Sequence, residues 1–390
     1  MASSLIDPDR LSDTFQQLVR IDSISKEERE LVRKLRPILD NLGAETIVDR
    51  AGERIGGQTG NLIARVPGNH RDVAPMLFSA HMDTVEPGRG IRPVVSDGVF
   101  RSDGATILGA DDKSAIAVLL EILHILVTRN LPHGPIDLVL TVCEEIGLLG
   151  SRYLDFDCLR ARIGYVLDSR DTEAIVIRAP SANRFDIVVH GREAHAGAAS
   201  ETGINAIALA ARAISTLETG RIDGETTCNI GLIHGGIATN IVPNRVSVTG
   251  EVRSHDEQKL RHLTGRITDT FQGIAEASGV EAADGLPRVD IHVTEQFTRT
   301  SVPENHPVVL LARQAARNLG RELTTKSSGG GADANVFFQN GITTGVLGTG
   351  PCDIHSVRES IALTDMVRAA ELVMEIVRLH AEAKSEKFKV

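Results

Sequence analysis

Hydrophobic positions follow helical and strand periods in turn from the N-terminus to about residue 178. Helical spacing of apolar residues predicts a first helix that Ser12 caps and a second helix over residues 27–43 that ends at Gly43. The short apolar runs that follow are typical of buried strands. These predicted strands are residues 46–50, 61–66, 76–81, 136–144 and 163–169.

The segment from Asp112 to about Val127 is apolar nearly all round, which predicts a buried helix. Strands that are apolar on both faces are expected inside a sheet that helices cover on both sides. After residue 300 helical and strand patterns of apolar residues alternate again. They predict a helix over 306–320, a buried strand over 341–348 and a closing helix over 364–383. These parts together predict an α/β domain, a mixed sheet covered by helices.

Between about residues 182 and 294 the order of elements changes to strand, helix, strand, strand, helix, strand. This order is typical of a ferredoxin-like α+β module. We therefore expect one catalytic domain split over residues 1–180 and 296–390, with residues 181–295 inserted as a second domain. The apolar side of the first helix in the insert is predicted to consist of Ile204, Ile207, Ala211, Ile214 and Leu217.

The composition excludes several classes of protein. A length of 390 residues suits two or three domains, and 42% hydrophobic residues suffice for large cores. The net charge of -10 and pI near 5.7 argue against a nucleic-acid partner. Four separated cysteines form no disulfide framework or zinc knuckle. Neither a signal peptide nor a membrane span is visible, so we expect a cytoplasmic protein without a membrane partner.

Acidic residues and histidines stand where predicted strands end. The strand over 76–81 finishes on His81, and Asp83 lies two positions later, so both would point to the same side. Because ligands of α/β sheets gather at the carboxyl ends of strands, we expect such residues to converge on one crevice. The others are Asp111 and Asp112, Glu144 and Glu145, Asp168, and His355.

Each of these residues also has an ordinary structural interpretation. Asp112 could cap the helix that follows it, Glu144–Glu145 could form a solvated turn, Asp168 an Asx turn, and His355 could precede a helix. Several carboxylates buried together without a cation repel one another, however, and a pair of divalent metals removes that cost. Imidazole and carboxylate ligands without thiolate suit Zn²⁺, with Co²⁺ or Mn²⁺ as alternatives.

A resemblance to a known family rests on these same segments. The motifs "SAHMDTV", "GADDKSAIA", "CEEIGLLGS", "LDS" and "HSVRESI", in this order, resemble those of the dinuclear zinc peptidases of the M20 family. "GGGADANVF" and the "GADDK" context are most similar to the peptidase T (tripeptide aminopeptidase) branch. The resemblance implies a phosphorylase/hydrolase-like zinc peptidase domain with an inserted lid or dimerisation domain.

The resemblance also implies a ligand set for two metal ions. His81 and Asp168 would bind one ion, and Glu145 and His355 would bind the other. Asp111 would bridge the two ions, and its peptide bond to the next residue is typically cis in the family.

Further roles follow from the resemblance alone. Asp83 would orient the histidine two positions before it, and Glu144 would be the general base. His195 would stabilise the oxyanion, often across a dimer interface, whereas Asn240 and Arg253 would hold substrate carboxylate or carbonyl groups. Without the resemblance, His195 would be read as a turn histidine and Arg253 as a charge at a strand edge.

The activity implied is metal-dependent hydrolysis of peptide bonds in short peptides, as an aminopeptidase that releases N-terminal residues from tripeptides. The alternatives are an N-acyl-amino-acid deacylase or a carboxypeptidase with the same site. A non-catalytic peptide- or metal-binding relative is a third possibility, but its expected mark is loss of Glu144 or a ligand, and the sequence keeps all of them. Expected partners are a short peptide or N-acyl amino acid and a second copy of the chain, bound through the inserted domain.

Overall fold

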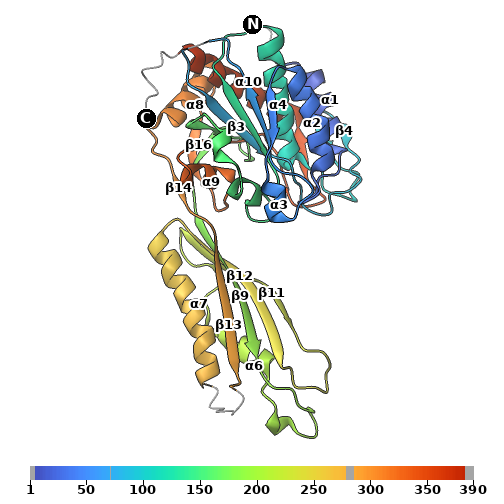
Figure 1. The fold of residues 1–390 in the computed structure, drawn as a ribbon, viewed down its shortest axis with the longest axis vertical. Helices are drawn as coiled ribbons and strands as arrows, with labels where there is room; N and C mark the ends of the chain where they lie inside the picture. Colours follow the sequence, from blue (N-terminus) through green and yellow to red (C-terminus); the bar gives the residue numbers. More distant parts are fainter. Residues whose placement is uncertain (1–4, 71, 278–284, 383–390) are drawn as a thin grey trace. The chain divides into compact units, whose positions relative to one another are not determined.

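The computed structural model describes residues 5–70, 72–277 and 285–382, which divide into two compact units. The first unit holds the described residues up to Arg178, together with Thr300–Ser328 and those from Ala332 onward. The second unit comprises Ala179–Arg299 and Gly329–Gly331. The strands of the two units form separate sheets (Figure 1). The buried residues of the two units belong to separate hydrophobic cores.

A mixed sheet forms the centre of the first unit, with the strand order β1-β2-β6-β3-β7-β16-β8-β14 and β15 paired to β8. β6, β3, β7 and β16 are parallel neighbours, whereas β1, β2 and β8 add antiparallel pairs on either side. The strands are β1 Glu45–Val48, β2 Leu62–Val66, β3 Met76–His81, β6 Ile136–Thr141, β7 Ile163–Val166, β8 Ala174–Ala179, β14 Thr300–Ser301, β15 Thr324–Ser327 and β16 Thr343–Leu347. A small separate sheet pairs β4 Val94–Ser96, β5 Val99–Arg101 and β17 Ser360–Ala362.

Alternate residues of the strands enter two different cores, as the period of two requires. On β3, Met76, Phe78 and Ala80 pack into the core under the long helices, whereas Leu77 packs into a smaller core on the other face. The long helices are α1 Pro8–Val19, α2 Arg29–Asn41, α4 Ala110–Thr128, α8 Pro307–Asn318 and α10 Leu363–Glu382. The smaller core includes α9 (Asp333–Gln339), and the short helices α3 Ala51–Ile55, α5 Leu149–Arg152 and η1 Phe156–Cys158 complete the unit.

The helix α4 is buried along nearly its whole length, from Ala110 to Leu126. It packs against α1, α10 and β3, so its apolar residues face protein on all sides. In the part of the chain that the structure describes, no helix combines the length and hydropathy needed to cross a membrane.

The first helix begins earlier than the sequence predicts. The Asp7 carboxylate caps α1 by accepting the N–H groups of Asp9 and Arg10, both at 3.1 Å, so the prediction that Ser12 is the cap is wrong. Pro8 explains the early start, because its fixed φ suits the first helical position and its missing N–H would have no partner there.

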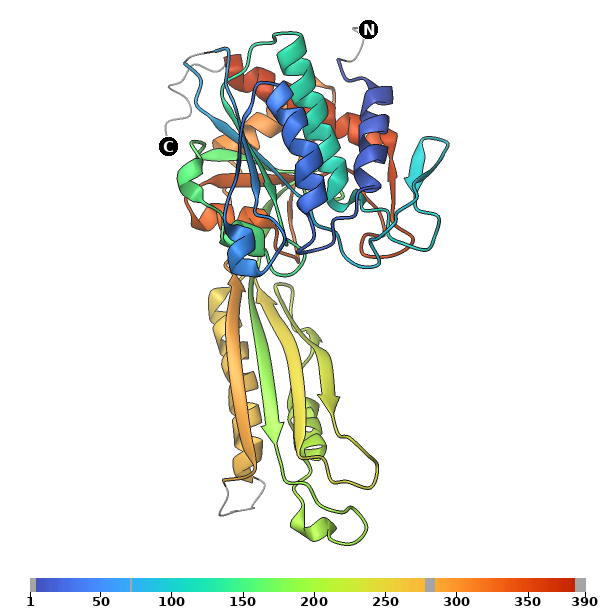
Figure 2. The same cartoon turned by 45° about the vertical axis from the view of Figure 1, so that its right-hand side comes forward.

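The second unit has an antiparallel sheet with the strand order β10-β11-β12-β9-β13. The helices α6 and α7 share one core with it (Figure 2), and the predicted order of strands and helices is present as β9-α6-β11-β12-α7-β13. The elements are β9 Ser181–His190, η2 Ser200–Thr202, α6 Ala206–Thr216, β10 Gly220–Arg221, β11 Thr226–Gly235, β12 Arg245–Ser254, α7 Glu257–Ala277 and β13 Arg288–Phe297.

The buried face of α6 differs from the predicted one. Ala206, Leu209, Ala210 and Ala213 are its buried residues, whereas Ile207 is 40% exposed. The predicted face counted the larger aliphatic residues, but the small alanine side chains on the neighbouring face let the helix approach the sheet closely. The structure therefore leaves an isoleucine at the surface.

Candidate functional site

His81 ends β3, the strand that lies between β6 and β7. Its ring is buried, with Nδ1 2.9 Å from the backbone carbonyl oxygen of Asp83 and Nε2 3.2 Å from Asp111 Oδ1. Since a carbonyl oxygen can only accept, Nδ1 carries the proton and the lone pair of Nε2 faces a carboxylate. Two acceptors at this distance need a proton or a metal ion between them.

Asp111 lies where α4 begins, after Gly109, whose φ is +72°. Its peptide bond to Asp112 is cis, as the family resemblance implies. The second oxygen of Asp111, Oδ2, is 3.3 Å from His355 Nε2, so this carboxylate lies between two imidazoles. Asp112 is not seen capping the helix; its Oδ2 accepts the backbone N–H of His81 at 3.1 Å.

Glu144 and Glu145 form a turn after β6, and the Asp83 carboxylate holds that turn. Asp83 Oδ1 accepts the N–H of Glu144 at 2.8 Å, and Oδ2 accepts the N–H of Glu145 at 3.2 Å and the Ser25 hydroxyl at 2.6 Å. The Asp83 carboxylate is also 3.5 Å from His81 Nδ1. Asp83 therefore orients the histidine mainly through its carbonyl, while its carboxylate positions the two glutamates.

The two adjacent glutamates differ in position. One oxygen of Glu145 and one ligand atom each of His81 and Asp111 lie within 4.8 Å of one another, whereas Glu144, Asp168 and His355 contribute no atom to that group. Glu145 Oε1 is also 2.9 Å from His355 Nε2. The structure thus gives the adjacent carboxylates different surroundings.

His355 is presented by a loop whose ends are joined. The backbones of Cys352 and Ser360 exchange two hydrogen bonds, of 2.8 and 3.0 Å, at the base of the loop. Within it His355 has φ +60°, and its side chain is 48% exposed. The residue lies in this loop and does not begin a helix.

The proton affinities of the cluster show an excess of negative charge. Burial raises the pKa of Glu144 and of Asp168 well above the usual range, and neighbouring carboxylates raise both further. Burial opposes protonation of His81, but hydrogen bonds to Asp111 and Asp83 outweigh it and raise its pKa well above normal. Hydrogen bonds to Asp111 and then Glu145 raise the pKa of His355 to about 10. The cluster therefore attracts protons strongly, and divalent cations would replace them.

The second unit carries the other predicted residues. His195 is exposed, and its Nδ1 accepts the N–H groups of Gly197 at 3.2 Å and Ala198 at 3.1 Å. Its Nε2 therefore holds the proton and is oriented as a donor. The N–H of Ala196 donates to the carbonyl of Asn240 at 2.9 Å, which joins the loops of both predicted residues.

Arg253 lies near the far end of β12 from these loops. Its guanidinium donates two bonds to the Glu251 carboxylate, at 2.9 and 3.0 Å. From Arg245, where β12 begins, to Arg253 the strand spans about 25 Å, whereas an extended tripeptide spans about 10 Å. Within one chain, Arg253 and the His195–Asn240 loops do not meet on one short peptide.

A comparison with family models decides the classification. The model for peptidase family M20/M25/M40 matches residues 77–379, which include all the predicted site residues. The chain belongs to this family. The family assignment and the fold predicted from the motifs are confirmed, and this M20 peptidase is a hydrolytic enzyme. The YXEP protein of Bacillus subtilis, described as a dinuclear metal-binding peptidase from the M20 family, shares this fold at 18% identity, with a TM-score of 0.69 over 96% of this chain and 98% of that one.

Similar proteins cover this M20 peptidase almost from end to end. The uncharacterized protein YqjE of Bacillus subtilis is 37% identical over 96% of this chain and 99% of its own. The structure of aminopeptidase PepT from Bacillus cereus is 38% identical, with a TM-score of 0.86 over 97% of this chain and 100% of that one. A tripeptidase from Staphylococcus aureus is 35% identical, with a TM-score of 0.90 over the same shares.

Sequence reasoning on this M20 peptidase missed buried carboxylates that support the site. Glu28 is fully buried, and its Oε1 accepts the N–H of Cys143 at 3.0 Å, a residue held at φ +53° just before the glutamate pair. Asp333 Oδ2 accepts the hydroxyl of Thr141 at 2.5 Å, at the end of β6. Glu28 stands in "KEERE", which is typical of an exposed helix start, so its local pattern gave no signal.

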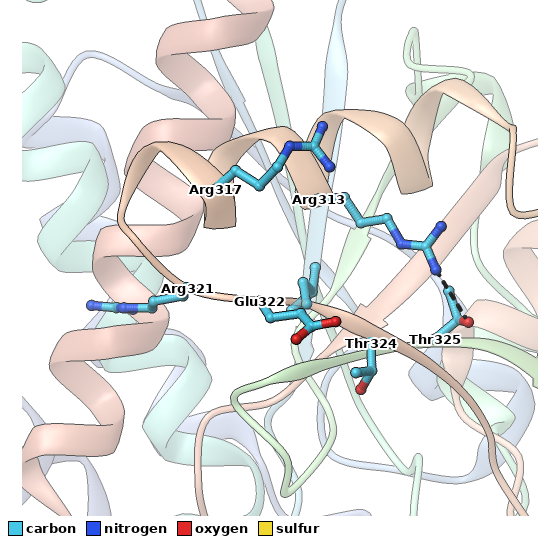
Figure 3. A pocket seen from close by; sticks show the side chains of 7 residues that line it. Arg313, Arg317, Arg321, Glu322, Thr324 and Thr325 are labelled. Carbon is cyan, nitrogen blue, oxygen red and sulfur yellow. Dashed lines mark hydrogen bonds between the residues drawn. The ribbon is translucent and has the colours of Figure 1, made fainter.

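A cavity of about 620 Å³ lies elsewhere in the M20 peptidase, beside α8 (Figure 3). None of the predicted site residues lines it. Its three arginines already have partners: Arg313 bonds Glu304 and Thr325, Arg317 bonds Gln314, and Arg321 bonds Glu371. This cavity therefore does not form part of the candidate site.

Proposed function

We propose that this M20 peptidase is a dinuclear metal-dependent aminopeptidase that releases the N-terminal residue from tripeptides. The observation that carries the proposal is the cluster in which Asp111 lies between His81 and His355, with Glu145 against the second imidazole. The aminopeptidase and tripeptidase named above support this substrate class, because both are at least 35% identical over nearly the whole chain.

The proposed metals fit the donor set. His81 with Asp168, and Glu145 with His355, would each hold one ion, and Asp111 would contact both. Ligand atoms of His81, Asp111 and Glu145 converge within 4.8 Å, and His355 lies 3.3 Å from Asp111 and 2.9 Å from Glu145. The place of Asp168 in this set rests on the family resemblance. His81 Nε2 faces an Asp111 oxygen across 3.2 Å, a contact that needs a proton or a cation, and burial and neighbouring carboxylates raise the pKa of Asp168. Both observations support cations at this position. Nitrogen and oxygen donors without thiolate suit Zn²⁺, with Co²⁺ or Mn²⁺ as alternatives. When bound, two such ions would polarise the peptide carbonyl and acidify the attacking water.

Glu144 would be the group that moves the proton. The residue is 9% exposed, and the Asp83 carboxylate accepts its backbone N–H at 2.8 Å. We assign it the proton of the attacking water, which it would return to the leaving amine. A desolvated carboxylate suits this role, because burial raises its basicity toward the pH at which the enzyme works.

The second unit would supply contacts to the substrate. His195 would donate from Nε2 to the carbonyl oxygen as negative charge develops on it, and Asn240 and Arg253 would bind carbonyl or carboxylate groups. About 25 Å of β12 separates Arg253 from the loops that carry His195 and Asn240. One tripeptide could therefore contact these three residues only if two chains supply them.

A homodimer through the inserted unit would meet this requirement. β10 pairs only with Thr227 and Cys228, so the rest of β11 is not covered by it. Along and beyond that part of β11, Leu232, Ile233 and Ile237 are 54%, 51% and 80% exposed. An open strand edge with exposed apolar side chains favours pairing with another chain.

The substrate class is tested with four compounds. Zinc-loaded protein is incubated with a tripeptide, its N-acetylated form, its C-terminal amide and an N-acetyl amino acid, and the products are identified by mass. We expect release of the N-terminal residue from peptides with a free amine, stopped by a chelator. Cleavage of the acetylated compounds alone would replace the aminopeptidase with a deacylase, and release of the C-terminal residue would indicate a carboxypeptidase.

The shared site is tested by mixing two inactive variants. If His195 acts across the dimer, chains with Glu144→Gln and chains with His195→Ala form mixed dimers that contain one complete site. After subunit exchange, about a quarter of the wild-type activity should return, since half the dimers are mixed and one of their two sites works. Leu232→Lys should weaken the dimer in analytical ultracentrifugation. A mixture that stays inactive while forming mixed dimers would contradict the role across the interface.

A further inference from the structure

Glu359 is a buried carboxylate at the base of the loop that presents His355. Its side chain is 1% exposed, and it accepts three backbone N–H groups from a segment about 250 positions away. Oε2 accepts from Leu108 at 2.8 Å and from Gly109 at 2.7 Å, and Oε1 accepts from Asp111 at 3.0 Å. Three hydrogen bonds to one charged group in a buried position form a rigid connection.

The connection joins two segments that each present one of the proposed ligands. Glu359 is itself tied to the His355 loop, because its N–H donates to the carbonyl of Ser356 at 3.0 Å and the next residue pairs with Cys352. Its carboxylate accepts backbone N–H groups from Leu108 and Gly109 and from Asp111, so it binds the main chain just before and at the start of α4. One side chain thus joins the two segments whose ligand atoms, His355 Nε2 and Asp111 Oδ2, lie 3.3 Å apart, and it contacts neither of these atoms.

We propose that Glu359 is a positioning residue, which sets the spacing between His355 and Asp111 and thereby the affinity of the metal site they share. This inference rests on the proposed dinuclear site. His81 has other supports, the Asp83 carbonyl and the Asp112 carboxylate. Loss of Glu359 should therefore weaken the site of Glu145 and His355 more than the site of His81 and Asp168.

The variant Glu359→Gln tests this with little change in volume. A glutamine has one acceptor oxygen, so its amide NH₂ must face at least one of the three N–H donors. A second variant, Glu359→Asp, keeps the charge but has a shorter side chain. The matched control is Asp137→Asn, because Asp137 is also fully buried and accepts two backbone N–H groups, from Arg160 at 2.6 Å and Ala161 at 2.9 Å. Asp137 lies near the start of β6, whereas the glutamate pair follows the end of that strand.

The measurement is titration of the metal-free full chain with Co²⁺, followed by calorimetry and by the visible absorption of the bound ion. Wild type should bind two ions. In Glu359→Gln one binding step should weaken by about 10- to 100-fold and its absorption band should change, with the other step within a few-fold of wild type. The control should bind both ions as wild type does. Glu359→Asp should lie between the two.

The outcomes separate the two proposals. A wild-type chain that fails to bind two ions contradicts the dinuclear site itself. Two ions bound with unchanged affinity and absorption by a folded Glu359→Gln variant overturn the role of Glu359 alone. An equal loss in the Asp137→Asn control would show that the effect comes from general destabilisation, which also overturns it.

Discussion

Replacing each member of the glutamate pair by glutamine should separate catalysis from metal binding. Glu145 Oε1 lies 2.9 Å from His355 Nε2 and within the converging group of ligand atoms, whereas Glu144 has no atom in that group. We expect Glu144→Gln to lower kcat by about 10²- to 10⁴-fold with both metals bound. We expect Glu145→Gln to lose one metal, with activity falling as a consequence.

The magnitudes follow from the surroundings of each side chain. Loss of a general base costs about 10²- to 10⁴-fold in kcat, or about 3 to 5 kcal/mol in the barrier. Burial raises the pKa of Glu144 well above normal, which means that folding disfavours its charged form, so a neutral amide of equal size should fold as well. In Glu145→Gln the contact with His355 loses its negative charge, but that imidazole is 48% exposed, so solvent limits the loss of stability to below about 1 kcal/mol.

The assay combines metal content of dialysed protein, Co²⁺ titration and steady-state kinetics on a tripeptide. Wild type is the reference, and each variant is first checked for cooperative unfolding. A Glu144→Gln enzyme with activity within a few-fold of wild type would refute the assignment of the base. Two metals bound as tightly by Glu145→Gln as by wild type would refute the ligand assignment. If Glu144→Gln instead lost a metal and Glu145→Gln lost activity with both metals bound, the two roles would have to be exchanged.

Three further perturbations test the scaffold. Asp83→Asn leaves at least one N–H of the Glu144–Glu145 turn without an acceptor, so chemical denaturation should show a loss of about 1 to 3 kcal/mol and kinetics a larger fall in kcat than change in KM. Burial lowers the pKa of His380, so the unfolded chain takes up the proton first as pH falls; below about pH 6.5 stability should drop by up to ~1.4 kcal/mol per pH unit more in wild type than in His380→Gln. Gly164→Ala would place a Cβ 2.1 Å from the carbonyl oxygen of Leu77, and the unfolding free energy should fall by about 1 to 3 kcal/mol or more.

Each of these predictions has a clear contrary result. Unchanged stability and kcat in Asp83→Asn would show that the turn is held by other groups. Parallel pH profiles for wild type and His380→Gln would contradict the burial argument. For the glycine, Gly265→Ala is the matched control, since its Cβ would meet nothing within 4 Å and it lies inside α7; it should be neutral or stabilising. Equal behaviour of the two glycine variants would contradict the close approach of β3 and β7.

The sequence by itself determined the central strands β3, β6, β7 and β16 and the residue types at their ends, but it did not predict shorter strands such as β4, β5 and β17. Apolar runs such as Met76–His81 are local signals, because a strand buried on both faces needs apolar side chains at every position until it leaves the core. A histidine or carboxylate at that point is therefore visible without the fold. The helix α6 shows the limit of such patterns. Its periodicity predicted a helix correctly, but the face that packs against the sheet carries Ala206, Ala210 and Ala213, and Ile207 is exposed.

Only the tertiary structure decided which of these polar groups meet. Glu145 and His355 are 210 positions apart, and Glu359 reaches the N–H of Asp111 across 248. Local spacing could not tell Glu145 from Glu144, show that Asp112 bonds the N–H of His81, or mark Glu359 as buried. The physical reason is that a side chain's propensities are local, whereas the partner of a buried charge is whichever group the packed chain brings within hydrogen-bonding distance.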